Sequence, residues 1–450
     1  MTNSKDDPFL YPNRDRSETA RGVSRRRMLV GSAAAGAAAT AGCAGGGEGG
    51  SGNESEGGSE GADGGGTATE TDPGDAPTPA SERPTVFVFN TGDGTVSVVD
   101  AESDEVVGTR ALGLSSSFPS NQYNPRLTTA PEDSLWLNVG RGVRALSVGS
   151  LAETAAVETE SGANWLERTP NGKHVVVSAR EPAHRQFRID ADPASEGFGE
   201  VTGDIDRTGE ETTGGQAGPG PCDVTIHPDG EFAYVPDLFG DTLTVLRIDP
   251  FEIETQVDVE PVGAGPARPW MGTVSPDGET LLVEHNEGET GTESLWDLSD
   301  PANPEERVRL TGEKGLGRRP LTSEIGPDSE TGYVFTPGSD DATVVDLVAG
   351  EVTGRLDLGG SAFVGTWDPA HAKLYVPVQT NDEVAVIDHA RGEIVERIAV
   401  GAKPYGATAA LARPRPDSTA ALGAAMAQLG IWTSVETTYC IGNCACGHRL

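Results

Sequence analysis

A short motif that recurs six times constrains the fold of this chain more than any other feature of its sequence. Each copy has a proline, a polar or glycine-containing turn and then a short apolar segment, as in TPNGKHVVV, HPDGEFAYV and SPDGETLLV. Proline presets φ for a turn, Asn-Gly or Asp-Gly closes a tight hairpin, and β-branched and aromatic residues favour strands. The motif therefore predicts a turn followed by a buried strand. Its copies begin at Ala130, Thr169, His227, Ser275, Gly326 and Asp368.

Further strand-like segments follow the motif. Residues 240–248, 339–347 and 380–388 alternate apolar and polar positions in part, as half-buried strands do. Residues 350–358 and 392–400 are two copies of a strand that comes after them. Four antiparallel strands in every 40–50 residues or so, repeated along the chain, are typical of the blades of a β-propeller.

The two ends of the repeat region predict how the ring closes. Residues 86–112 hold three strand-like segments but lack an innermost strand, which residues 404–411 can supply. We therefore predict an all-β, seven-bladed β-propeller over 84–411, with six or eight blades as alternatives. An acidic, glycine-rich insert at 191–220 accounts for the longest interval between motifs. The predicted blades are 84–112 with 404–411, 126–158, 164–200, 222–260, 267–310, 320–358 and 362–400.

Three segments carry a resemblance to a known family: FVFNTGDGTVSVVD, AYVPDLFGDTLTVL and LYVPVQTNDEVAVID. They resemble the YVTN-type β-propeller repeats, a family that also covers surface-layer proteins. The same region is distantly similar to the haem d1 propeller of nitrite reductases and to lactonase propellers. Where the family usually has an asparagine, this chain has Pro236 and Pro377. The resemblance implies the fold and says little about a reaction, because one fold hosts many functions.

The N-terminal segment 24–43, SRRRMLVGSAAAGAAATAGC, resembles a twin-arginine export signal that ends in a lipoprotein cleavage site. Arg25 and Arg26 would be read by the export receptor, and Cys43 would become the lipidated first residue of the mature chain. Thr40 departs from the Leu-like residue that usually stands three positions before the cysteine. The alternatives to a cleaved signal are an uncleaved alanine-rich anchor and a disordered tail.

Residues 44–83 predict a disordered tether of glycine, serine and acidic residues, because they lack apolar side chains to bury. A coil of this length has a root-mean-square reach of roughly 35 Å. Together with the export signal, the tether predicts a domain held by membrane lipid, through Cys43, at the extracellular face of the cytoplasmic membrane.

The acid excess describes the surroundings of the protein. The chain has 33 Lys and Arg against 70 Asp and Glu, for a net charge of −37. Such a surface repels phosphate backbones and argues against nucleic-acid binding. Only five of the basic residues are lysine, and an acidic chain so poor in lysine is typical of salt-loving archaea. An ordinary acidic protein from a GC-rich genome is the alternative.

Residues at the starts of the innermost strands and in the loops between blades are the candidate ligand site. Several are basic in an otherwise acidic chain, and they could form a ring that holds an anion or a carboxylate. The alternative is that they pair with neighbouring carboxylates. The candidates that we single out are Arg126, Trp165, Arg268, Trp270, Arg319, Lys403 and Tyr405, with Tyr123, Asn124, Asn164, Pro221, Cys222 and Asp223 near them.

Two further histidine-containing sites are weaker candidates. His227 begins an HPDG turn, where we expect it to cap the local backbone. Glu284, His285 and Asn286 end a strand, where a metal or a general base could lie. The sequence shows no serine nucleophile elbow, phosphate-binding loop, zinc-protease helix or haem-attachment motif.

The C-terminal segment 412–450 ends in a cluster of soft ligands: Cys440, Cys444, Cys446 and His448. Three thiolates and an imidazole within nine residues suit copper or zinc. Disulfides are an equal alternative, because these cysteines and Cys222 make four thiols once Cys43 carries lipid. Free thiols are the third alternative, after metal binding and disulfides.

Two classes of function follow from these observations. The first is an exported, membrane-anchored propeller that acts as a non-catalytic binding module for a surface protein, a glycan or a small anion. The second is a redox or metal-handling protein that uses the C-terminal cluster. An enzyme of lactonase or haem d1 type is a weaker third.

Overall fold

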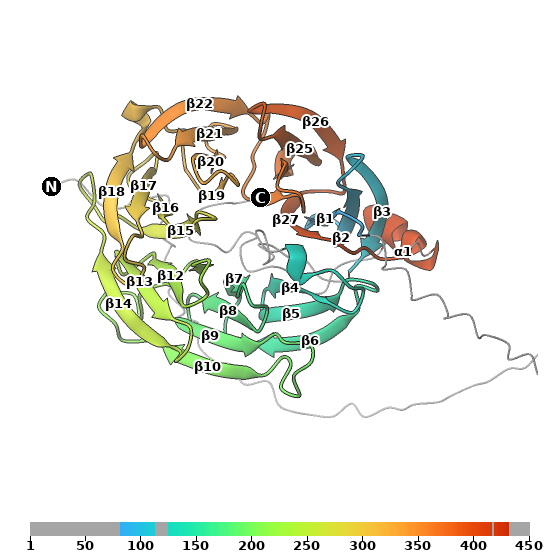
Figure 1. The fold of residues 1–450 in the computed structure, drawn as a ribbon, viewed down its shortest axis with the longest axis horizontal. Coiled ribbons are helices and arrows are strands. Elements are labelled where there is room, and N and C mark those ends of the chain that lie inside the picture. The colour runs from blue at the N-terminus through green and yellow to red at the C-terminus, as the bar shows by residue number, and fades with distance from the viewer. Residues whose placement is uncertain (1–81, 113–124, 416–417, 432–450) are drawn as a thin grey trace, which may run out of the picture. The chain divides into compact units, whose positions relative to one another are not determined.

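The computed structural model describes residues 82–112, 125–415 and 418–431. Seven antiparallel sheets are arranged around a common centre, and in each sheet the strands follow one another in order from the centre to the rim (Figure 1). The chain is therefore a seven-bladed β-propeller, as the repeat predicts. None of the helices in these ranges is long and apolar enough to cross a membrane.

The strands of each blade are given from the centre outward. Blade 1 has β27 (Pro404–Ala410), β1 (Thr85–Asn90), β2 (Thr95–Asp100) and β3 (Glu105–Ala111). Blade 2 has β4 (Ser134–Val139), β5 (Gly142–Ser147) and β6 (Glu153–Glu158). Blade 3 has β7 (Ala163–Arg168), β8 (His174–Ala179), β9 (Arg185–Asp190) and β10 (Val201–Asp206). Blade 4 has β11 (Thr225–Ile226), β12 (Phe232–Asp237), β13 (Thr242–Arg247) and β14 (Glu252–Asp258).

The remaining blades repeat the same order. Blade 5 has β15 (Pro269–Val274), β16 (Thr280–His285), β17 (Thr292–Asp297) and β18 (Glu305–Leu310). Blade 6 has β19 (Thr322–Ile325), β20 (Thr331–Thr336), β21 (Asp341–Asp346) and β22 (Glu351–Asp357). Blade 7 has β23 (Thr366–Trp367), β24 (Lys373–Val378), β25 (Glu383–Asp388) and β26 (Glu393–Ala399). The helices are η1 (Pro125–Leu127), η2 (Gly312–Lys314), η3 (Gln379–Asn381) and α1 (Ser418–Gln428).

Blade 1 closes the ring with strands from both ends of the repeat region. β27 pairs antiparallel with β1, and Thr85 lies opposite Ala410 in the register. Six backbone-paired positions along this seam give the ring a continuous hydrogen-bonded closure. The predicted partnership of 84–112 with 404–411 is confirmed.

The core lies in the interfaces between blades. The inner and middle strands are buried on both faces, as in β1 and β12, because each sheet is stacked between two others. The outer strands β14 and β22 alternate exposed and half-buried residues, so they cover the core on one face only.

Two blades differ from the predicted pattern. Among the described residues, the sheet of blade 2 has three strands, and the chain before β4 contains η1 in place of an innermost strand. There the Thr128 carbonyl accepts a hydrogen bond from the Leu411 amide of blade 1 at 2.8 Å, so this segment bonds to a neighbouring blade. In blade 3, the predicted insert 191–220 contains β10, which is the outer strand of the sheet.

Candidate functional site

Three basic residues occupy the same place in three blades. Arg268, Arg319 and Lys403 each precede a proline in the loop that leads into an innermost strand, β15, β19 or β27. Since these strands begin at one end of the ring, the three residues lie at one mouth of the propeller, which we call the entry mouth. Arg319 and Lys403 are exposed, and Arg268 is half-buried.

The backbone of these residues is held in an uncommon conformation. Their φ angles are 50° at Arg268, 59° at Arg319 and 50° at Lys403, in the left-handed region that non-glycine residues rarely adopt. Such a conformation costs about 1–3 kcal/mol and persists only where the surroundings fix it. Here the amides of Arg268 and Lys403 donate to the carboxylates of Asp241 and Asp382, both at 2.8 Å, from the preceding blades.

Aromatic side chains gather at the innermost strands. Trp165, Trp270, Phe363 and Tyr405 belong to one buried cluster that takes residues from blades 1 and 3 to 7. The rings of Phe363 and Tyr405 pack with their centroids 5.1 Å apart. The cluster therefore brings together the three aromatic residues that the sequence singled out, as a shared apolar core of the ring.

A buried polar group adjoins this cluster between blades 3 and 4. Arg180, which follows β8, is fully buried, and its Nε lies 2.6 Å from Glu181 Oε2. Its Nη1 lies 3.5 Å from Cys222 Sγ, and Asn164 Nδ2 lies 3.2 Å from the same sulfur. Burial raises the pKa of the Cys222 thiol to about 11, against the opposing charge of Arg180, so the thiol is protonated and weakly nucleophilic.

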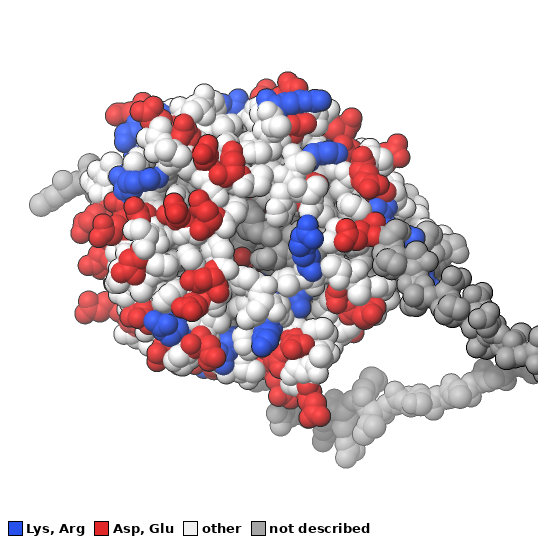
Figure 2. Space-filling view, in the orientation of Figure 1, with Lys and Arg blue, Asp and Glu red and all other residues white. Residues whose placement is uncertain are grey.

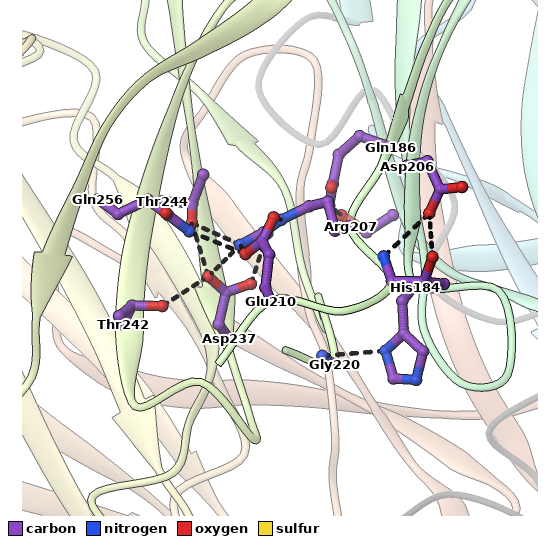
Figure 3. A network of polar contacts seen from close by, with 12 residues as sticks. His184, Gln186, Asp206, Arg207, Glu210, Gly220, Asp237, Thr242, Thr244 and Gln256 are labelled. Atoms are coloured by element: carbon purple, nitrogen blue, oxygen red, sulfur yellow. Dashed lines mark hydrogen bonds and ion pairs between the residues drawn. The ribbon is translucent and has the colours of Figure 1, made fainter. Parts of the chain in front are cut away.

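The loop that carries Cys222 is tied down by a network around Arg207 (Figure 3). Arg207 is fully buried, and its guanidinium bonds Asp237 at 2.7 and 2.9 Å and Glu210 at 2.8 and 2.9 Å. Burial by itself would lower the pKa of Arg207, but these two carboxylates outweigh burial and raise the pKa above its ordinary value. The Arg207 amide also donates to the His184 carbonyl, and His184 Nδ1 accepts from the Gly220 amide at 3.2 Å. The network thus joins the loop after β10 to the start of blade 4.

Buried carboxyl groups also lie in blades 4 and 5. Asp223 accepts from the amide of Gly272 in blade 5 at 2.7 Å. Glu284 and Glu293 lie opposite each other on β16 and β17, and both are fully buried. Burial raises the pKa of Glu284 to about 8, and burial together with the charge of Glu284 raises that of Glu293 well above its usual range.

In the EHN segment, the side chains of Glu284 and His285 do not share a site. Successive side chains of a strand point to opposite faces, so Glu284 and His285 lie on different sides of the sheet. His285 Nε2 lies 2.7 Å from Ser294 Oγ, and burial lowers the pKa of His285 well below its usual range. His227 Nδ1 accepts from the Asp229 amide in its own turn.

Arg126 lies apart from the other basic candidates. It is exposed on η1, and its charge helps burial to lower the pKa of His371. His371 lies in the turn that follows β23, at the end of an innermost strand opposite to the entry mouth. Arg126 therefore does not join Arg268, Arg319 and Lys403.

Other candidates fall outside the described residues: Arg25, Arg26, Cys43, Tyr123, Asn124, Cys440, Cys444, Cys446 and His448. Within the ranges that the structure describes, no group of three or more His, Cys, Asp and Glu side chains is arranged to hold a metal ion. Arg180, Glu181 and the Arg207 network were not found from the sequence, because a basic residue after a strand gives no signal of its partners.

Comparison with known proteins shows the fold. Neither a protein-family model nor a curated protein sequence matches the chain. Among solved structures, it is similar to the periplasmic gluconolactonase of Pseudomonas aeruginosa, with 16% identity and a TM-score of 0.56 over 73% of this chain and 99% of that one. It is also similar to a putative 6-phosphogluconolactonase of Bacteroides fragilis, with 17% identity and a TM-score of 0.57 over 74% of this chain and 99% of that one. Hydrazine synthase of Kuenenia stuttgartiensis is similar as well, with 15% identity and a TM-score of 0.51 over 72% of this chain and 99% of that one.

Proposed function

We propose that this chain is an exported, membrane-anchored β-propeller of YVTN type that binds a small organic anion at its entry mouth. The observation that carries the proposal is the shared placement of Arg268, Arg319 and Lys403. Three blades each hold a basic residue at the same position, in a backbone conformation that has an energetic cost. Nine other described non-glycine residues share this φ range, so the signal is the basic side chain repeated at the same position and not the backbone alone.

The charge around the ring favours an anionic ligand at this place. Carboxylate side chains spread over the rim of the face in Figure 2, so a group of three basic residues is an exception on this acidic ring. Guanidinium and ammonium groups form charge-assisted hydrogen bonds with a carboxylate, and these are stronger than bonds between neutral groups. The acid excess elsewhere discourages anions from binding over the rest of the surface.

Isothermal titration of the full chain with citrate tests this proposal. The variant Arg268→Gln, Arg319→Gln and Lys403→Gln keeps the loops but removes three positive charges. We expect it to bind citrate at least about tenfold more weakly, as the loss of one or more charge-assisted hydrogen bonds predicts. A matched variant, Arg141→Gln, Arg355→Gln and Arg391→Gln, removes the same charge elsewhere. Equal weakening in both variants, or no citrate binding by the parent, contradicts the proposal.

An assay of glucono-1,5-lactone hydrolysis separates binding from catalysis. Two of the similar structures are described as a lactonase and a putative lactonase, so this substrate is the natural test of an enzyme with this fold. We expect no acceleration over buffer. A rate that falls in the Arg268, Arg319 and Lys403 variant would instead assign a lactonase activity to the entry mouth.

A further inference from the structure

The exposed apolar residues of the propeller gather at one place. Eight large apolar side chains are exposed in the described ranges, and five of them lie on β3 and on α1 with the residues after it. The other three lie on separate blades. Single exposed apolar residues are ordinary, whereas a cluster marks a surface that contacts something else. The five are Val107, Leu422, Met426, Leu429 and Ile431.

Helix α1 is built to expose its large residues. It lies at the outer rim of blade 1 beside β3 (Figure 1). Within 421–428, the part of α1 whose side chains the structure describes, the buried positions are the small residues Gly423, Ala424 and Ala427, which let the helix approach the sheet closely. Leu429, just after the helix, is 75% exposed. The apolar side chains therefore point away from the blade and do not contribute to its core.

Arginines flank this apolar surface. Arg110 on β3 donates to the Arg415 carbonyl at 2.6 Å, which holds the segment before α1 against the blade. Arg83, Arg110 and Arg413 line a cavity of about 150 Å³ at the same place. Arg413 is paired with Asp100 at 2.8 Å, whereas Arg83 and Arg415 are exposed. In a chain with 33 basic and 70 acidic residues, four arginines beside an apolar surface form a local exception.

The N-terminal segment joins the propeller at the same surface. The Arg83 amide donates to the Leu411 carbonyl at 2.9 Å, so the chain that precedes Glu82 enters blade 1 a few residues from the start of the C-terminal segment. Any membrane anchor upstream of residue 82 therefore tethers the propeller through this blade.

We propose that the blade 1 surface formed by β3, α1 and these four arginines docks on a membrane that has anionic headgroups. The apolar side chains enter the interface between headgroups and acyl chains, and the exposed Arg83 and Arg415 contact the phosphates, as on interfacial amphipathic helices. Docking at this rim holds the propeller edge-on. This surface is separate from the entry mouth, so the inference rests on the membrane anchoring in the proposed function and not on its anion site.

Flotation with lipid vesicles tests the docking. The chain that begins at Ala44 carries neither the lipid nor the basic export signal, so it reports the contribution of the folded surface. We expect it to bind phosphatidylglycerol-containing vesicles and to bind neutral phosphatidylcholine vesicles more weakly. Each of Arg83→Gln and Arg415→Gln should weaken binding to the anionic vesicles about fivefold at low salt. Leu429→Ser should weaken it about tenfold at both low and molar salt, because the apolar contribution is not screened.

Matched control variants show whether vesicle binding depends on the blade 1 surface. Arg141→Gln and Arg391→Gln remove exposed arginines from other blades, and Val348→Ser removes a valine that is 72% exposed. These variants should bind as the parent does. In a chain that also carries Trp432→Phe, quenching by brominated lipid should reach a tryptophan at Leu429→Trp and not at Val348→Trp. Equal binding by the test and control variants overturns the proposal. Concentration-dependent dimerisation that Leu429→Ser abolishes also overturns it, because a second copy would then cover the surface.

Discussion

At the scale of single residues, burial decides what the charged groups of this propeller can do. Arg207 is fully buried, yet its pKa is raised because two carboxylates surround it. Glu284 is equally buried without such a partner, so its pKa rises to about 8. A sequence motif such as EHN cannot distinguish these situations, because the partners come from strands far along the chain.

The pH dependence of stability should report Glu284. Its pKa is raised from 4.5 to about 8 in the folded chain, so the folded state binds more protons than the unfolded state between these values. The stability it contributes is therefore complete below pH 4.5 and is lost as the pH rises through 8, by up to about 1.4 kcal/mol per pH unit. We expect Glu284→Gln to reduce this loss and to unfold with a higher free energy than the parent above pH 8.

Denaturant unfolding at several pH values, with the salt concentration fixed, measures the effect. Glu351→Gln on the outer strand β22 is the control, because Glu351 is exposed. Parallel pH profiles for the parent and Glu284→Gln would show that Glu284 does not hold a proton in the folded chain.

At the scale of elements, most strands were recognisable from the repeat, and the exceptions have physical causes. β10 was assigned to an insert, although its sequence GEVTGDID matches GEVTGRLD of β22 in six of eight positions. Glycine and acidic residues are common in loops as well as in this outer-strand pattern, so composition alone predicts an insert here whereas the internal similarity predicts a strand. The innermost position of blade 2 could not be predicted, because η1 and Thr128 bond to blade 1 in place of a sheet of their own.

The closing seam between β1 and β27 can be tested by a designed crosslink. Val86 and Ala409 are register partners and share one buried cluster, so their side chains lie on the same face. We expect Val86→Cys with Ala409→Cys to form a disulfide, detected as a linked peptide by mass spectrometry, because paired positions in adjacent strands bring the β-carbons close enough. Val86→Cys with Ala410→Cys is the control, since Ala410 points to the opposite face. Crosslinking in the control alone would place the seam in another register.

At the scale of the whole molecule, the charge of −37 is a property of the surface. Carboxylates cover the rim in Figure 2, and many have no basic residue to pair with because the acids outnumber the bases about two to one. Mutual repulsion of this kind destabilises a compact state.

Salt should therefore stabilise the propeller. Raising the ionic strength from about 0.1 M to about 1 M shortens the screening length from about 10 Å to about 3 Å, which removes most repulsion between neighbouring carboxylates. We expect the Tm measured by calorimetry to rise steadily over this range in potassium chloride. A Tm that falls or stays constant would mean that the surface acids are already compensated.

The sequence by itself determined the propeller, its seven blades and its closing seam. Those features depend on local turn chemistry and on apolar periodicity, which each repeat carries within itself. Only the tertiary structure decided which groups meet: the Arg268 amide with the Asp241 carboxylate, the Arg207 guanidinium with Asp237, and α1 with β3. These contacts join different blades or different ends of the chain, and their distances depend on how the blades stack. A repeat specifies its own strands, whereas the surroundings of a side chain are specified by its neighbours.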